Sequence, residues 1–246
     1  MPNWVYGSYA IKGKKENILN FLNEGLKNSN EATKSTCREA FDKLVNNAKT
    51  KETKNDVFDF SPDKPKEICV MNNLTLDTFR PMPDTFLMWD TTNHSKELKK
   101  QAKEQLNKYG FVGWYDYGIY VLRGTKWNAE LNGFSLDECD DVATIKFTCD
   151  TAWNVPEKWL RWVKETFKVN VLLCCSEEYN SFNLFGEIDK LIDYGDYFSN
   201  GDCPKQEDYD NEDDYWDALY EYQEGKKENM ICGFDNFVYD FEIDIP

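Results

Sequence analysis

The stretch Val142–Cys175, VATIKFTCDTAWNVPEKWLRWVKETFKVNVLLCC, predicts a strand, a helix and a second strand in succession. Residues 143–150 alternate between apolar and polar side chains, which indicates a strand with one buried face. Pro156 suits the first turn of the helix, and the closing run VNVLLCC is apolar throughout, as expected of a central strand. The inward side chains of the first strand are Ala143, Ile145, Phe147 and Cys149, and those of the helix are Trp159, Leu160, Trp162, Val163 and Phe167.

A similar strand and helix lie at the start of the chain. Residues 3–12, NWVYGSYAIK, alternate and predict a strand, after which Gly13 turns the chain into an amphipathic helix. Further strands are predicted at 118–123, GIYVLR, and at 182–188, FNLFGEI. The order strand, helix, strand, strand, helix, strand is that of the split βαβ, or ferredoxin-like, unit. We therefore expect an α+β fold with an antiparallel sheet at its core.

Two helical insertions are predicted within this core, at about 31–48 and 95–109. Both segments carry apolar side chains at helical spacing. The core with its insertions then occupies residues 1–188. Residues 189–246 form an acidic, aromatic-rich extension that we expect to pack on the core.

The extension carries almost all of the net charge. It holds 18 acidic residues against four lysines, so −14 of the total of −16 lies there. Its twelve aromatic residues are too many for a disordered acidic tail. Residues 211–225, NEDDYWDALYEYQEG, predict a short helix that ends at Gly225. Residues 237–245 alternate between apolar and mostly acidic side chains and predict a strand.

Composition argues against several other classes of protein. No apolar run approaches the roughly 18 residues of a membrane span, and the first residues do not have the pattern of a secretory signal. The eight cysteines include no Cys-x-x-Cys pair and the one histidine is His94, so no metal site or cofactor is predicted. Reduced cysteines suit the cytoplasm. Asp196–Glu207 partly matches a calcium loop, but Phe198 and Pro204 occupy ligand positions.

The turn in YVLRGTKWNAE, Tyr120–Glu130, looks at first like a phosphate-binding loop, because Gly124 is followed by Thr125 and Lys126. A Walker loop has a longer glycine-rich stretch, a lysine that precedes Ser or Thr, and a helix directly after it. None of these features is present here. The sequence therefore argues against a nucleoside triphosphatase of this type.

Two interpretations of the turn remain. In the first, Gly124 supplies a change of direction, Trp127 and Trp153 pack, and Lys126 pairs with an acid. In the second, Trp114, Lys126, Trp127 and Trp153 form a shallow ligand site near the Gly124–Trp127 turn. The ligand of such a site would be a small molecule or a nucleotide, and the protein could then be an enzyme.

Four stretches of the chain, taken in order, resemble the YubB ferredoxin-like family of phages and conjugative plasmids. They are MPNWVYGSYAIKG, FVGWYDYGIYVLRGTKWNAE, IKFTCDTAWNVPEKW and VLLCCSEEYNSFNLFGEI, within residues 1–188. Arg123 stands where the family has tryptophan, and Val155-Pro156 replaces a double proline. The resemblance implies a ferredoxin-like fold and a mobile-element origin, and it implies no established reaction.

The charge and the resemblance together predict a non-enzymatic accessory protein that binds a host protein. Direct nucleic-acid binding is not expected, because phosphate attraction needs a basic face. Carboxylates in fixed positions suit a partner with a basic surface, and a DNA-mimic inhibitor of a host defence factor would work in this way. On the predicted strand, alternate acids would lie about 6–7 Å apart. The predicted partner-binding residues are Asp213, Asp214, Asp217, Asp240, Glu242 and Asp244.

Overall fold

The computed structural model describes residues 3–28, 66–71, 74–83, 96–178, 182–193 and 204–243, together with Arg38 and Asp42. Within them the chain is an α+β protein built on an antiparallel sheet, as expected. The strands follow the order β2-β4-β5-β1-β6-β7-β8, and β3 pairs with β4. Their bounds are β1 Trp4–Lys14, β2 Lys66–Met71, β3 Leu74–Thr75, β4 Glu130–Cys139, β5 Val142–Ala152, β6 Asn170–Glu177, β7 Asn183–Glu187 and β8 Ile192–Asp193.

Strand β1 lies between β5 and β6 and is antiparallel to both. Trp4 is opposite Ala152 of β5, and Val5 is opposite Glu177 of β6. The strand beginning at Trp4 therefore pairs with both strands of the Val142–Cys175 stretch. The alternation predicted for β5 is also confirmed, because its four inward side chains are buried.

The prediction of a strand at 118–123 is wrong. Helix α5, Trp114–Tyr117, continues into a π-helical turn, η1, at Gly118–Leu122, and the Arg123 N–H donates to the Gly118 carbonyl at 2.7 Å. The other neighbour of β5 is β4, which the sequence analysis missed. A register shift between Asn132 and Ser135 interrupts the alternation of β4, and alternation is the signal by which strands are recognised.

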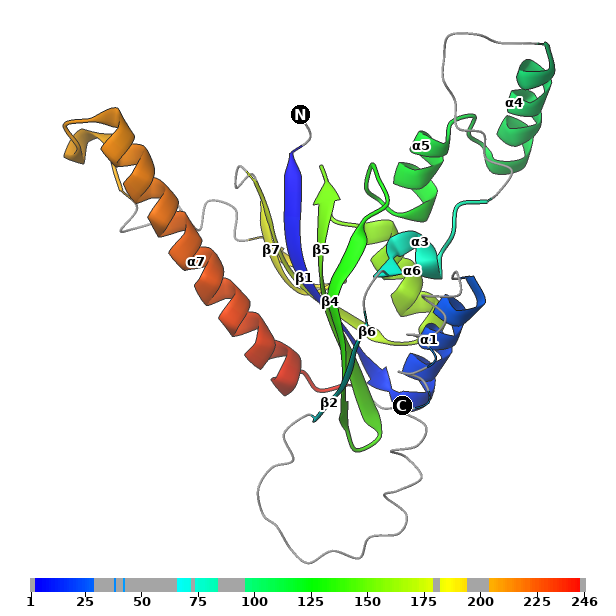
Figure 1. Cartoon of the computed structure of the whole chain (residues 1–246), viewed down its shortest axis with the longest axis horizontal. Coiled ribbons are helices and arrows are strands. Elements are labelled where there is room, and N and C mark those ends of the chain that lie inside the picture. Colours follow the sequence, from blue (N-terminus) through cyan, green and yellow to red (C-terminus); the bar gives the residue numbers. More distant parts are fainter. Residues whose placement is uncertain are drawn as a thin grey trace, which may run out of the picture.

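The helices cover the two faces of the sheet unequally (Figure 1). One face is covered by α1, Lys15–Asn28, by α3, Leu76–Phe79, and by α6, Glu157–Phe167. The other face is crossed by α7, Glu212–Asp240, which follows a 3-10 turn, η3, at Gln206–Asp208. Helix α4, Lys96–Tyr109, matches the insertion predicted at 95–109.

Three regions singled out in the sequence fall where the structure gives little or no description. The insertion predicted at 31–48 lies outside the described residues except for Arg38 and Asp42. His94 and most of 196–207, the stretch compared with a calcium loop, also lie outside them. These predictions therefore stay predictions.

The main core lies between the sheet and helices α1, α3 and α6. Phe21 of α1 stacks on Phe79 of α3 with ring centroids 4.3 Å apart. Trp159 of α6 is completely buried and meets both rings edge-on, while its Nε1 donates to the Leu76 carbonyl at 2.9 Å. A fully buried aromatic side chain of this kind contributes about 1.5–3 kcal/mol through loss of water contact, so these rings fasten the helices to the sheet.

Tyr9 folds back over the strand that carries it. Its ring stacks on Phe147 at 5.3 Å, and a Cβ built on Gly7 would lie only 2.4 Å from the Tyr9 hydroxyl oxygen. Residues i and i+2 of a strand share a face, so Gly7 provides the space that the ring fills. The hydroxyl is buried, and among the described residues it has no hydrogen-bond partner. Burial raises the pKa of Tyr9, which therefore stays protonated.

A smaller core lies on the opposite face, beneath the C-terminal turns of α7. Ala10, Leu172 and Cys174 of the sheet are buried together with Phe234 and Val238 of the helix. Phe185, Phe237 and Phe241 pack around them and stay partly exposed. Burial raises the pKa of the Cys174 thiol to about 12, so this thiol is protonated at neutral pH.

Helix α7 replaces two elements that were predicted separately. It is a single helix of 29 residues, so the predicted helix end at Gly225 and the predicted strand at 237–245 are both wrong. The side chains that contact the sheet recur at positions 234, 237, 238 and 241, which is a helical spacing. Apolar and mostly acidic residues also alternate in this segment, so its sequence is compatible with a helix and with a strand. Packing on the sheet favours the helix.

Ion pairs cross the boundary that was predicted after residue 188. Asp189 accepts hydrogen bonds from Lys164 and Arg161 of α6, each at 2.5 Å. The bond from Lys164, followed by its charge and by Arg161, outweighs partial burial and lowers the pKa of the Asp189 carboxyl. Lys164 also pairs with Glu187 at 2.6 Å. The first residues of the extension therefore share contacts with the core.

Candidate functional site

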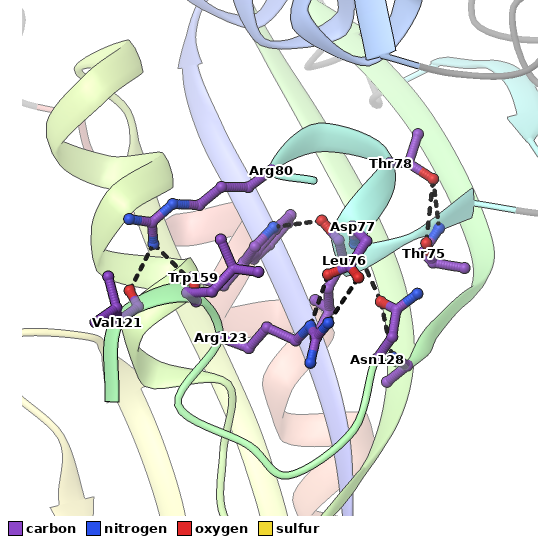
Figure 2. A network of polar contacts seen from close by, with 11 residues as sticks. Thr75, Leu76, Asp77, Thr78, Arg80, Val121, Arg123, Asn128 and Trp159 are labelled. Carbon is purple, nitrogen blue, oxygen red and sulfur yellow. Dashed lines mark hydrogen bonds and ion pairs between the residues drawn. The ribbon is translucent and has the colours of Figure 1, made fainter. Parts of the chain in front are cut away.

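A bidentate ion pair fixes the start of the Gly124–Trp127 turn. Arg123 donates through Nε and Nη2 to the two carboxylate oxygens of Asp77, each at 2.6 Å (Figure 2). The Arg123 side chain is 3% exposed and that of Asp77 is 23% exposed, so the pair lies largely out of water. Since Asp77 belongs to α3, the pair joins the turn to the helical face of the sheet.

Two further contacts hold the turn against α3 (Figure 2). Arg80 Nη1 donates to the carbonyls of Val121 and Leu122, at 3.1 and 2.8 Å. At the far end of the turn, Asn128 Oδ1 accepts from the backbone N–H of Asp77 at 3.1 Å. Both ends of the turn are therefore bonded to α3. These bonds fix the conformation of the turn in the absence of a ligand.

The turn closes the N-terminus of α6. Gly124 has φ +91°, and a Cβ there would lie 2.9 and 3.0 Å from the backbone nitrogens of Lys158 and Glu157. The N–H of Trp159 donates to the Arg123 carbonyl at 3.1 Å. Free amides at a helix N-terminus are what binds a phosphate, and here the backbone of the turn lies against them. At this helix end the turn therefore occupies the place beside the amides that a bound phosphate would need.

Thr125 and Trp153 join the turn to the end of β5. The Thr125 hydroxyl is buried and donates to the Ala152 carbonyl at 2.8 Å. The Trp153 N–H donates to the Asn3 carbonyl at 2.8 Å. Trp153 has φ +73°, a left-handed conformation that costs a bulky residue roughly 1–2 kcal/mol. These bonds hold the residue in this strained conformation.

Lys126 lies among aromatic rings, which we call the ring cluster: Tyr115, Trp127 and Trp153. Its Nζ is 4.0 Å from the Trp153 ring centroid, 5.0 Å from that of Trp127 and 5.2 Å from that of Tyr115. Each distance is within the ~6 Å range of a cation–π contact. Trp127 and Trp153 remain 37% and 43% exposed, so the cluster is an aromatic surface that carries a positive charge.

The structure brings together three of the four residues predicted for the ligand site. Lys126, Trp127 and Trp153 meet, whereas Trp114 reaches the cluster only through an edge contact with Tyr115 at 5.9 Å. Lys126 lies over rings where the first interpretation expected a carboxylate. Tyr115 was missed, because no helix was predicted at Trp114–Tyr117 and no local pattern indicated that its side chain would face Lys126.

We expect Lys126→Met to lower the free energy of unfolding by about 1 kcal/mol, since exposed cation–π contacts contribute roughly 0.5–1 kcal/mol. Methionine keeps the apolar stem of the side chain, so the change reports on the ammonium group. Urea unfolding measures the difference. Lys100→Met, on the exposed face of α4, is the control and should have almost no effect. A loss above 3 kcal/mol at Lys126 would contradict the description of the cluster as a surface feature.

The N-terminal half of α7 has an exposed stripe of alternating acidic and aromatic side chains. Asp213, Trp216, Asp217 and Tyr220 follow the i, i+3, i+4, i+7 spacing and therefore share one face of the helix. All four are exposed, Trp216 by 54% and Tyr220 by 66%. We call these four residues the α7 stripe.

The six predicted partner-binding acids do not form one site. Asp213, Asp214 and Asp217 are exposed in the first turns of α7, while Asp240 is its last residue and Glu242 follows it. At 1.5 Å per residue, Asp217 and Asp240 are roughly 35 Å apart along the helix. Asp244 lies outside the described residues. Asp240 is helical and Glu242 is not in a strand, so these two described residues do not have the strand spacing that was expected for Asp240, Glu242 and Asp244.

Among the described residues, no cluster of His, Cys, Asp and Glu side chains has an arrangement that could hold a metal ion. No helix of that part of the chain is long and apolar enough to cross a membrane. Comparison of the chain with protein-family models, with curated proteins and with solved structures gave no match in any of the three.

Proposed function

We propose that this protein binds a basic protein partner through the α7 stripe and performs no catalysis itself. The observation that carries the proposal is the exposure of Asp213, Trp216, Asp217 and Tyr220 on one helix face. Two carboxylates accept charged hydrogen bonds, and two rings offer faces on which a cation can stack. The combination suits arginine, whose planar guanidinium does both.

The charge of the extension supports the same partner chemistry. A net charge of −14 within 189–246 creates a field that attracts a basic surface over a range of about 10 Å at 0.1 M salt. Such a field raises the rate of association, and the aromatic side chains of the stripe supply contact area once the surfaces meet. A nucleic-acid-binding host protein, which has a basic surface of its own, is the partner class that we favour.

We also infer that the central part of the sheet is a ferredoxin-like unit. The strand order β4-β5-β1-β6, with α1 after β1 and α6 after β5 on the same face, supports this assignment. Together with the resemblance to the YubB family, it favours a phage or plasmid accessory protein that acts in the host cytoplasm. An inhibitor of host defence that imitates DNA would be a protein of this kind.

The binding proposal is tested with isosteric substitutions. Asp213→Asn with Asp217→Asn removes two charges from the stripe, and Glu104→Gln with Glu165→Gln removes two from exposed positions elsewhere. The probe is a nine-residue arginine peptide, followed by proteins captured from a nuclease-treated bacterial lysate. We expect the stripe variant to weaken binding at least tenfold, the control to weaken it less than threefold, and the affinity of the unchanged chain to fall steeply with salt.

Equal effects of the two double variants would mean that only net charge matters, and the stripe would then not be the site. A captured partner whose affinity is insensitive to the stripe substitutions and to salt would contradict the proposal as a whole. Circular dichroism of each variant establishes that the comparison is made between folded proteins.

A second candidate function is supported by the ring cluster. Exposed Trp127 and Trp153 beside the Lys126 ammonium offer a stacking surface next to a positive charge, as a nucleotide or another anionic aromatic molecule would need. Titration with ATP, followed by tryptophan fluorescence, tests it. Saturable quenching that Lys126→Met weakens and Trp153→Ala removes would favour this alternative, and the absence of quenching at millimolar ATP would exclude it for this ligand.

A further inference from the structure

Among the side chains that the structure describes, those by which α7 contacts the sheet lie near the C-terminal end of the helix. The buried side chains of the contact are Phe234 and Val238, which rest on Ala10, Leu172 and Cys174. Farther toward the N-terminus, Trp216 and Tyr220 are exposed, and the helix diverges from the sheet (Figure 1). The described part of α7 is therefore held to the sheet by a short apolar contact at one end.

Hollows flank this contact on both sides. A cavity of about 660 Å³ lies toward β4 and β5, where Val142 and Thr144 face Val238 and Phe241. Another of about 670 Å³ lies toward β6 and β7, where Asn170 and Phe185 face Phe237 and Phe241. Dispersion contacts are lost wherever surfaces do not meet, so the apolar contact that holds α7 is narrow as well as short.

Lys12 of β1 supplies the main polar contact to this end of the helix. Its Nζ donates to the carbonyls of Val238, Tyr239 and Phe241, at 2.8, 3.0 and 2.7 Å. The last carbonyls of a helix have no partner within it and form the negative end of its dipole, so an ammonium group there is well placed. Burial lowers the pKa of Lys12, because the ammonium has lost much of its water.

We propose that α7 docks on the sheet and leaves it as a unit, and that Lys12 is the latch that holds it docked. The contact is short, flanked by hollows and closed by one partly buried cation. Segments with few buried contacts open locally without global unfolding. The proposal goes beyond the proposed function, because it concerns the protein alone. It would also mean that the α7 stripe is carried on a movable element.

Two neighbouring cysteines provide the measurement. Cys174 is 3% exposed and lies under α7, whereas Cys175 is 1% exposed and belongs to the main core on the opposite face. Undocking of α7 uncovers Cys174 and leaves Cys175 covered. The rate at which iodoacetamide labels each thiol in the native full-length chain, resolved by tandem mass spectrometry, therefore separates undocking from unfolding.

In the unchanged protein we expect Cys174 to be labelled faster than Cys175. Lys12→Met keeps the stem but leaves three carbonyls without the ammonium, and it should speed the labelling of Cys174 by about tenfold or more. Lys146→Met is the matched control: Lys146 lines the same cavity and pairs with the exposed Asp235 of α7 at 3.0 Å. Its loss should change the rate less than threefold.

Val238→Ala weakens the apolar contact and serves as a second variant should Lys12→Met fold poorly. It should also speed the labelling of Cys174 selectively. Three results would contradict the role proposed for Lys12. The first is an unchanged labelling rate of Cys174 in Lys12→Met, and the second is an equal effect of Lys146→Met. The third is a parallel rise in the labelling of Cys174 and Cys175 in both Lys12→Met and Val238→Ala. None of these outcomes depends on a partner, so the proposed function stands or falls separately.

Discussion

Asp77→Asn should lower the free energy of unfolding by about 3 kcal/mol, because it leaves the Arg123 guanidinium buried without a counter-charge. Arg123 is 3% exposed, so water does not replace the carboxylate. The substitution is isosteric, and its cost therefore measures the charge and not the packing. Urea unfolding with an unchanged m-value gives the difference.

Removing the other partner should cost less. Arg123→Met leaves Asp77, which is 23% exposed and can recover part of its hydration, so we expect a loss of about 1–2 kcal/mol. In the Arg123→Met background, Asp77→Asn should then cost less than about 1 kcal/mol, because the unpaired cation is gone. Equal costs for the two single variants, or additivity in the double variant, would contradict a charge pair whose buried member is the arginine.

Gly7→Ala should lower the free energy of unfolding by about 1–3 kcal/mol, since the new methyl group overlaps the Tyr9 ring. The calculated Cβ lies 2.4 Å from the hydroxyl oxygen of Tyr9 and 2.5 Å from two of its ring carbons. The ring has little room to move, because it is buried and stacks on Phe147. Thermal or urea unfolding measures the loss.

Variants at Tyr9 identify the cause. Tyr9→Phe alone should be neutral or slightly stabilising, because it removes a buried hydroxyl without a hydrogen-bond partner among the described residues. It should not rescue Gly7→Ala, since the clash with the ring carbons remains. A smaller side chain, as in Tyr9→Leu, should recover part of the loss in the double variant. Full rescue by phenylalanine would show that the hydroxyl alone caused the strain.

The central strands and their helices were predictable because one period dominated each of them. Strand β5 alternates between apolar and polar side chains from Ala143 to Asp150, and α6 repeats its apolar residues at helical spacing over three turns. Two predictions failed where the pattern of apolar residues was ambiguous or interrupted: the strand at 237–245 was wrong, and β4 was not predicted. The segment around Phe237 carries both a helical and an alternating pattern, and only the sheet surface beneath it decides between them. The alternation of β4 is broken by its register shift.

The ring cluster was only partly predictable for a different reason. Lys126 and Trp127 are neighbours in sequence, and Trp153 directly follows β5, a strand that the sequence predicts. Tyr115 comes from the helical segment Trp114–Tyr117, for which no element was predicted, and the π-helical turn η1 connects that segment to the turn that carries Lys126. The ion pair between Arg123 and Asp77 was likewise invisible, because 46 residues separate its partners and no local pattern couples them.

The place of β1 at the centre of the sheet has a consequence for biosynthesis. The strand leaves the ribosome before β5 and β6 have been made. Trp4 cannot pair with Ala152, nor Val5 with Glu177, until those residues have been synthesised. At about 5–20 residues per second, the intervening chain takes roughly 8–30 s to appear. During that time an apolar strand has both edges unpaired. Chaperone binding to nascent chains of this protein should accordingly persist until β6 has emerged, and should fall sharply once it has.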